Sequence, residues 1–199
     1  MELTQQISDI SAYLAADDVI DHEHPCVRET VERLRSETID AYTYASAAFG
    51  FVRDSIEHSA DSGDLRVTWR ASDVLGARTG VCYAKAHALA ALLRAAGIPA
   101  GLCYQRLADD DGTNPSVHGL IALKLPGRER WARQDARGNK PGVDARFSLD
   151  KERLAWVVRP EFNEVDYPVL YAAPHPAILG ALRAAADRPE LWRTLPTEL

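Results

Sequence analysis

The sequence has no long hydrophobic run: no apolar stretch among its 199 residues is long enough to cross a bilayer. The segment Met1–Gln6 has no basic residues followed by an apolar run, so we expect no signal peptide. Internal repeats and a Gly/Ser-rich linker are also absent, and a 46% hydrophobic composition suffices for one buried core. These features predict no membrane partner and a single domain over residues 1–199.

The sequence has few cysteines, and its acidic residues outnumber its basic ones. The three cysteines, Cys26, Cys82 and Cys103, are an odd number, and without an export signal they argue against a disulfide framework. A reducing compartment fits best, so we expect a cytoplasmic location. With 23 Lys and Arg against 29 Asp and Glu, the formal net charge is -6. We expect no nucleic-acid partner, because phosphates repel an acidic surface.

The first third of the sequence has the pattern of helices. Apolar residues at helical spacing predict one helix that begins at His24-Pro25 and another over about 40–58. The polar segment 59–64 is predicted to be a loop. A central helix is predicted from about Gly80 to Ala96, where Gly97 supplies a stop signal.

Three strands are predicted after the central helix, and the rest of the chain is less regular. The strands are expected at about Pro99–Leu107, Val117–Leu125 and Arg130–Ala136. The turn between the last two, 126–129, has four residues. Further along, 165–171 has the pattern of another strand and 177–186 that of a helix. Helices followed by an antiparallel sheet predict an α+β domain, with the N-terminal helices packed on the sheet.

Cys82 stands at the start of the central helix. Thr79-Gly80-Val81 is expected to form the cap, so that Cys82 lies in the first turn at the electropositive end. A thiol attacks as the thiolate, and both a helix amino terminus and an adjacent imidazolium favour that form. The position makes Cys82 a candidate nucleophile, although a cysteine in an alanine-rich helix is, taken singly, commonly a small core residue.

His118 and Asp135 fall on the last two predicted strands. Residues two apart share a face of a strand, so an even connecting loop places these side chains on the same face, opposite or diagonal. An odd loop would put them on opposite faces, and a bulge would be needed. A single histidine on a strand commonly forms hydrogen bonds with its neighbours and has no catalytic role. The shared face and the helix-start cysteine, however, together support a joint function.

These three residues predict a cysteine-dependent acyl-transfer enzyme that acts on amide bonds. Cys82 attacks the carbonyl, His118 takes and returns the proton, and Asp135 fixes the imidazole's tautomer and orientation. The backbone N–H of Cys82 and one side-chain donor would hold the oxyanion, and both Trp69 and Gln105 are candidates for that donor. The expected partner is a peptide or another amide-containing substrate.

Three blocks of the sequence resemble the transglutaminase-like superfamily. Residues 80–100, GVCYAKAHALAALLRAAGIPA, are similar to its segment in which a glycine and the catalytic cysteine open a helix ending in a Leu-Arg-x-x-Gly-Ile-Pro-Ala type turn. Residues 116–120 resemble its histidine strand and residues 131–140 its aspartate segment. The resemblance covers about Arg70–Phe147, and flanking stretches look like the bacterial stand-alone members.

The resemblance implies a papain-type cysteine fold with a Cys-His-Asp triad at Cys82, His118 and Asp135. Microbial members are often thought to be peptidases or amidases, so hydrolysis is the expected reaction. Animal cross-linking members are longer, multidomain and calcium-regulated, and typically have tryptophan after the catalytic cysteine. This sequence has Tyr83 there, which makes cross-linking of glutamine to lysine the less expected activity.

Readings from two other classes stay open. A binding module could keep this fold without turnover, because a fold does not fix an activity. A metal protein could use Cys82 or Cys103 with histidines. The run His22-Glu23-His24, however, lacks the paired spacing of a structural zinc site, so we expect no metal and no cofactor. Substrate specificity is expected to lie in the loops 107–116 and 150–167; the sequence does not determine the oligomeric state.

Overall fold

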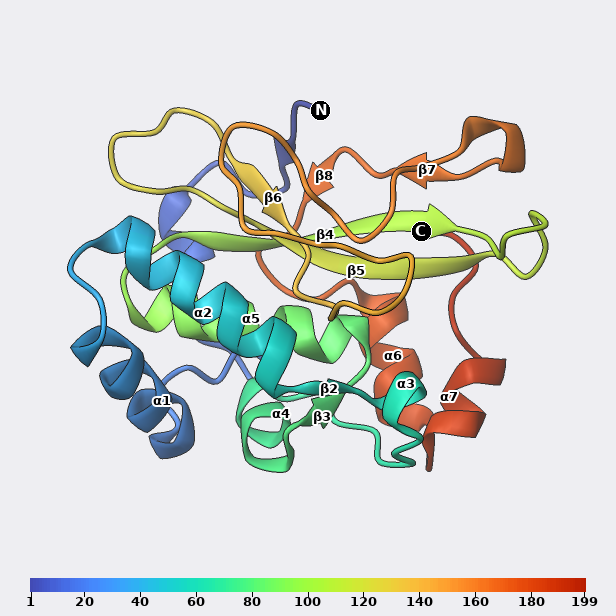
Figure 1. The fold of residues 1–199 in the computed structure, drawn as a ribbon, viewed down its shortest axis with the longest axis horizontal. Coiled ribbons are helices and arrows are strands. Elements are labelled where there is room, and N and C mark those ends of the chain that lie inside the picture. Colours follow the sequence, from blue (N-terminus) through green and yellow to red (C-terminus); the bar gives the residue numbers. More distant parts are fainter.

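The helices gather against one side of an antiparallel sheet in the computed structural model, which describes residues 1–199 (Figure 1). The helices are α1 (Pro25–Ser36), α2 (Ala41–Ser55), α3 (Ser59–Ser62), α4 (Ala71–Ala77), α5 (Cys82–Ala95), α6 (Pro176–Ala184) and α7 (Arg188–Arg193), with 3-10 turns η1 (Ile10–Tyr13) and η2 (Pro160–Phe162). The strands are β1 (Thr4–Gln5), β2 (Glu57–His58), β3 (Thr79–Gly80), β4 (Ala100–Leu107), β5 (Ser116–Leu123), β6 (Ala132–Gln134), β7 (Val165–Asp166) and β8 (Val169–Leu170). The predicted α+β class is confirmed.

The first two long helices begin where their capping residues stand. His24 precedes α1 and accepts a hydrogen bond from the Cys26 N–H at 3.2 Å, with a proline in the first turn. Asp40 and Thr43 form a reciprocal capping box at the start of α2. The latter helix ends at Ser55, earlier than the predicted His58, because Glu57 and His58 pair with β3 instead.

The central helix α5 is buried on every side. All residues from Tyr83 to Arg94 are buried. The reason is position: α5 packs against α1, α2 and α4 as well as against β4 and β5. Its predicted start at Gly80 shifts to Cys82 because Thr79 and Gly80 form β3.

The main sheet has four antiparallel strands in the order β6-β5-β4-β7. Alternate residues of its strands belong to two different hydrophobic clusters. Leu102, Tyr104 and Ile121 belong to the larger cluster, which contains the α5 residues, whereas Cys103 and Leu120 belong to a smaller one. The smaller cluster is completed by residues of the N-terminal region and of β8, among them Tyr13 and Leu170. Both faces of the sheet are therefore covered.

Three local predictions differ from the structure. The polar segment 59–64 contains a short helix, α3, whose first residue Ser59 is fully buried. The predicted strand 165–171 is divided into β7 and β8, which pair with different partners, and Pro168, which cannot donate a ladder hydrogen bond, lies between them. The hairpin between β5 and β6 has a loop over 124–131 rather than the four-residue turn.

Arg94, near the end of α5, is a buried cation that joins distant parts of the chain. Its guanidinium donates hydrogen bonds to the backbone carbonyls of Ala15, Ala100 and Ala172. Only 4% of the residue is exposed, so these carbonyls replace the water that the charge would otherwise bind. One side chain thus connects the N-terminal region, β4 and the segment before α6.

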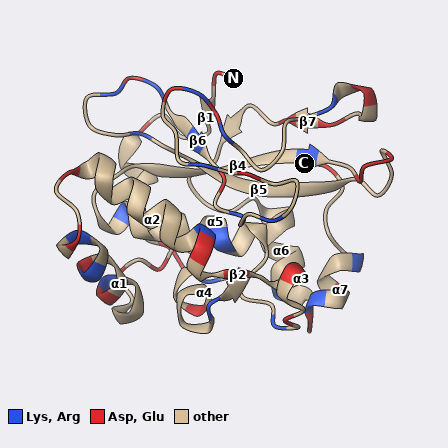
Figure 2. Cartoon of the chain, viewed as in Figure 1, with Lys and Arg blue, Asp and Glu red and all other residues tan.

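The charged residues are mixed over the surface elements. Figure 2 shows Lys and Arg interspersed with Asp and Glu on the helices and loops, with an acidic turn between β4 and β5. Among the helices, none combines the length and the apolar character needed to span a membrane.

Candidate active site

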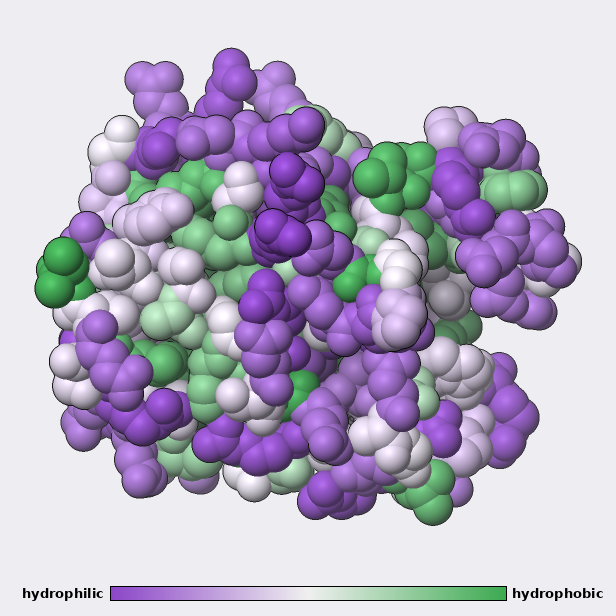
Figure 3. Space-filling view, in the orientation of Figure 1, coloured by the Kyte–Doolittle hydropathy of each residue, from purple (hydrophilic) through white to green (hydrophobic).

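A cleft of about 950 Å³ opens between the sheet and the C-terminal helices. Its walls come from the β4–β5 loop, the start of α5, the segment 137–143, the segment 156–164 and the end of α7. Figure 3 shows a notch on this face of the molecule, between the β4–β5 loop with β7 and the region of α7. Both loops in which specificity was expected, 107–116 and 150–167, contribute lining residues.

Cys82 is the first residue of α5 and lies on the cleft wall. Its side chain is partly exposed, and the preceding Val81 is extended and provides no side-chain cap to the helix. The helix can start here because Gly80 has no side chain: an added Cβ would lie 2.9 Å from the Ala84 Cβ and 3.1 Å from the Thr68 Oγ1. The uncapped N–H groups of the first turn therefore point to the same region as the thiol.

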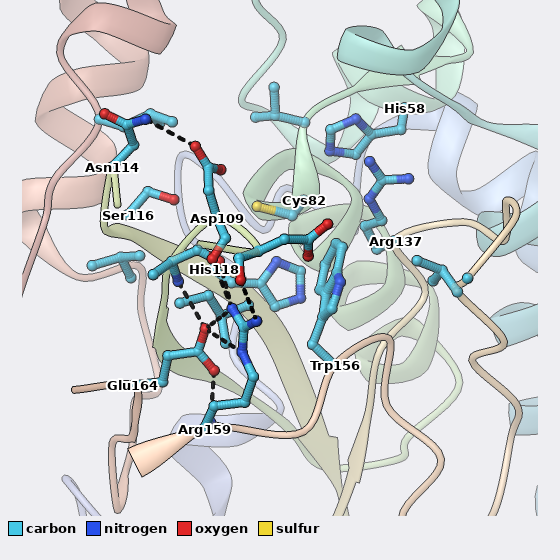
Figure 4. A pocket seen from close by; sticks show the side chains of 18 of the residues that line it. His58, Cys82, Asp109, Asn114, Ser116, His118, Arg137, Trp156, Arg159 and Glu164 are labelled. Carbon is cyan, nitrogen blue, oxygen red and sulfur yellow. Dashed lines mark hydrogen bonds and ion pairs between the residues drawn. The ribbon is translucent and has the colours of Figure 1, made fainter. Parts of the chain in front are cut away.

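A second glycine brings α5 against the histidine strand. A Cβ on Gly119 would lie 2.5 Å from Tyr83 Cδ1 and 3.2 Å from Tyr83 Cα. The Tyr83 hydroxyl also donates a hydrogen bond to the Val117 carbonyl. The first turn of α5 thus packs directly on β5 beside His118, and both Cys82 and His118 line the cleft (Figure 4).

His118 and Asp135 lie together, on one face of the sheet. The register pairs Ile121 with Gln134, so by extension Asp135 follows opposite Leu120, two residues from His118. This is the diagonal arrangement expected for an even loop, although the loop is longer than predicted. His118 Nε2 and Asp135 Oδ2 are 2.9 Å apart, and the two residues are 6% and 1% exposed.

Every partner of the Asp135 carboxylate donates to it. Besides His118, the backbone N–H groups of Ala155 and Arg137 donate to it, each at 3.1 Å. Burial opposes ionisation, but the charge of His118 and these hydrogen bonds keep the pKa of Asp135 below its usual value of 3.8. Burial likewise opposes protonation of His118, and the charges and hydrogen bonds of Asp135 and Cys82 outweigh it and raise the His118 pKa to about 10.

Trp156 packs against the histidine in the cleft. Its ring meets the His118 ring edge-on, with centroids 5.0 Å apart and planes at 86°. The guanidinium of Arg137 lies 5.4 Å from the centroid of the same indole and pairs with Asp61. A covered ion pair is screened less by water, so Trp156 strengthens the interaction between His118 and Asp135.

The structure does not bring the two sequence-predicted oxyanion donors into the cleft. The Trp69 ring packs against the guanidinium groups of Arg70 and Arg183, and Trp69 does not line the cleft. Gln105 is directly opposite His118 in the register, but its Nε2 donates to Asp166 at 2.8 Å. Its amide nitrogen is thus engaged by Asp166, and Gln105 does not line the cleft.

His58 is a cleft residue that the sequence analysis did not select. It is 7% exposed, lines the cleft with Cys82, and has no hydrogen-bond partner for Nδ1. Burial and the positive charge of Arg137 lower the pKa of His58 to about 3. No local pattern signals this position, because only the pairing of β2 with β3 places His58 level with Gly80.

The side chains around the cleft that could ligate a metal do not form a metal site. No three His, Cys, Asp or Glu side chains of residues 1–199 come together in a way that could hold a metal ion. All three cysteines are free thiols, and Cys103 is buried in the smaller hydrophobic cluster.

The family follows from a comparison with known proteins. The model of the transglutaminase-like superfamily matches residues 28–136, which is more than half of the chain. The chain belongs to the transglutaminase-like superfamily. This confirms the resemblance seen in the sequence, although the match begins in α1, well before Arg70, and includes the helices that pack on α5. No curated protein matches this transglutaminase-like sequence.

This transglutaminase-like chain is similar to solved structures. A "putative cysteine protease" from Cytophaga hutchinsonii is 23% identical with a TM-score of 0.54, over 66% of this chain and 43% of the other. The periplasmic domain of TgpA from Pseudomonas aeruginosa is 23% identical with a TM-score of 0.47, over 66% and 48%. The chain thus spans less than half the length of either protein.

Proposed function

We propose that this transglutaminase-like chain is a cysteine-dependent acyl-transfer enzyme acting on amide bonds, with Cys82, His118 and Asp135 as its triad. The observation that carries the proposal is the buried His118–Asp135 hydrogen bond of 2.9 Å, in a cleft whose wall holds a helix-start thiol. A nucleophile, an imidazole and an orienting carboxylate are the parts that such chemistry needs.

The raised pKa of His118 supports the roles of the three residues. At neutral pH the imidazole holds its proton, and an imidazolium beside a thiol favours the thiolate, which is the nucleophile. The thiolate of Cys82 attacks the amide carbonyl, and His118 gives its proton to the leaving amine. Asp135 keeps the ring oriented through Nε2, so that Nδ1 is the nitrogen that faces the reaction.

Hydrolysis is the reaction we propose for the second half of the cycle. His118, neutral after the amine leaves, would take a proton from water, which attacks the thioester and restores the thiol. A peptide or amidated substrate fits a cleft of about 950 Å³, which is within the usual range for small-molecule and peptide sites.

The test is acylation of the thiol, compared in matched variants. Wild-type protein incubated with p-nitrophenyl acetate is expected to gain one acetyl group on Cys82, detected by intact-mass and peptide mass spectrometry. Cys82→Ala should lose this label, whereas Cys26→Ala, which removes a partly exposed cysteine on α1, should keep it. Equal labelling of Cys82→Ala would contradict the proposal. Adding a primary amine then separates hydrolysis from transfer: acetate as the main product supports hydrolysis, and the acetylated amine supports transamidation.

The alternative is a binding module that keeps the fold without turnover. In that case the Cys82→Ala variant would fold and bind its ligand as the wild type does, and the wild type would form no acyl-enzyme. The partly exposed thiol on the cleft wall favours the enzyme over this alternative. The cytoplasmic location stays a prediction.

A further inference from the structure

The cleft holds a buried imidazole that no part of the triad uses. His58 ends β2, which pairs in parallel with β3, and the register sets His58 beside Gly80, two residues before Cys82. Figure 4 shows the His58 ring near the start of α5, on the same wall of the cleft as Cys82 and next to Arg137. The ring therefore flanks the helix end at which a carbonyl would be attacked.

The His58 side chain has no partner in the protein. It is 7% exposed, its Nδ1 is buried, and neither ring nitrogen takes part in a hydrogen bond. Nδ1 is enclosed by protein, so Nε2, which also has no protein partner, is the nitrogen that a group in the cleft can reach. Because its pKa is lowered to about 3, the ring is neutral at ordinary pH and carries one N–H donor.

The helix next to it also has free donors. Val81 caps α5 without a side-chain hydrogen bond, so the N–H groups of the first turn have no side-chain acceptor. A helix amino terminus favours negative charge, and two N–H donors that converge on a carbonyl oxygen stabilise the oxyanion of a tetrahedral intermediate. The uncapped helix start and the orphan imidazole are two separate observations on one spot.

We propose that His58 is the second oxyanion donor, acting with the backbone N–H of Cys82 on an amide or ester carbonyl. The inference rests on the proposed function. When the Cys82 thiolate attacks, a C–S bond forms and the π pair of the carbonyl moves onto oxygen, which accepts the two N–H hydrogen bonds. The pair then returns to form C=O, the C–N bond breaks, and the amine leaves with the proton from His118.

Two other donors near the cleft, Arg137 and Gln105, are engaged elsewhere. Both terminal nitrogens of Arg137 donate to Asp61, and Gln105 donates to Asp166. Trp69, the other predicted donor, lies outside the cleft. His58 replaces both sequence candidates because it combines a place beside Cys82 with a free N–H.

Two reactions of the same thiol separate this role from others. Acylation by p-nitrophenyl acetate passes through an oxyanion, whereas alkylation by iodoacetamide displaces iodide in one step and forms none. We expect His58→Phe, which keeps a ring without an N–H, to be acylated about 100-fold more slowly and alkylated at the wild-type rate within about threefold. His58→Gln, which restores an N–H, should recover at least about tenfold of the acylation rate. Trp69→Phe, the matched loss of an indole N–H outside the cleft, should acylate like wild type.

Each outcome has one meaning. Wild-type acylation in His58→Phe, or an equal fall in acylation and alkylation, overturns the assignment of His58. If His58→Phe does not fold by circular dichroism, His58→Leu is smaller and is assessed by the same two rates. A wild-type protein that is not acylated at Cys82 overturns the proposed function and this inference with it, whereas an acylated wild type with an equally acylated His58→Phe overturns this inference alone.

Discussion

Replacing Asp135 by asparagine tests the ion pair on which the site depends. The carboxylate is 1% exposed and accepts three hydrogen bonds, from His118 Nε2 and from the backbone N–H groups of Ala155 and Arg137. An amide has the same shape but only one oxygen. Its NH₂ group must therefore face at least one of these donors, whichever way the side chain is turned.

The cost follows from that geometry. A buried N–H left without an acceptor costs about 1–3 kcal/mol, and the remaining hydrogen bonds lose the benefit of a charged acceptor. We expect Asp135→Asn to lower the free energy of unfolding by about 3 kcal/mol at pH 6, near the lower end of the cost of breaking a buried ion pair.

The deficit should depend on pH with a definite sign. Because the folded-state pKa of His118 is raised from 6.5 to about 10, its contribution is complete below about pH 6.5 and is lost as the pH rises toward 10. The pKa of Asp135 is lowered from 3.8, so the carboxylate's contribution is present above that value and is lost only at lower pH. The difference between wild type and Asp135→Asn is therefore largest between about pH 4 and 6.5.

Urea unfolding followed by tryptophan fluorescence measures this difference at pH 6 and at pH 10. The matched control is Asp150→Asn, because Asp150 is 83% exposed and pairs with Arg128 at 3.0 Å. Loss of that surface pair should change the free energy of unfolding by less than about 1 kcal/mol at either pH. The reasoning is refuted if the two variants are equally stable at pH 6, or if the Asp135→Asn deficit grows between pH 6 and pH 10.

Two further measurements test the packing around the site. Gly119→Ala should destabilise the protein by about 1–3 kcal/mol in urea, because the new Cβ would lie 2.5 Å from Tyr83 Cδ1. Gly50→Ala, in α2 with nothing within 4 Å of its added Cβ, should be neutral or stabilising, and equal losses in both would contradict this account. The disulfide reagent DTNB should modify two thiols of the native protein quickly. Cys103 should react only after unfolding, because burial excludes the reagent and raises the Cys103 pKa; three fast thiols would be the contrary result.

Local patterns predicted the centre of the molecule well. The alanine- and leucine-rich segment became α5, and the alternating segments after Pro99 became β4 and β5 within one or two residues of the expected bounds. Period and stop signals act over a few residues, so the sequence displays them directly. The alternation of side chains along a strand was predictable for the same reason. It placed His118 and Asp135 on one face of the sheet, even though the predicted length of the loop between the strands was wrong.

Long-range pairing was not predictable from local patterns. The two-residue bridge between β2 and β3 sets His58 beside Gly80, yet neither segment has the length or alternation of a strand. Gln105 was one of two candidate donors, but its amide binds Asp166, which pairs with Arg133 in a network formed from three strands. The assembled sheet decides which polar groups take part in such a network, so the local sequence does not reveal them.

The buried guanidinium of Arg94 limits how far this chain can be shortened. It needs the Ala15 and Ala172 carbonyls, and both lie outside the family-matched segment 28–136. A fragment cut to that segment would enclose a cation with a single remaining acceptor, at the carboxyl end of the helix that begins with Cys82. We therefore expect both flanks to be needed for folding, in addition to the family-matched segment.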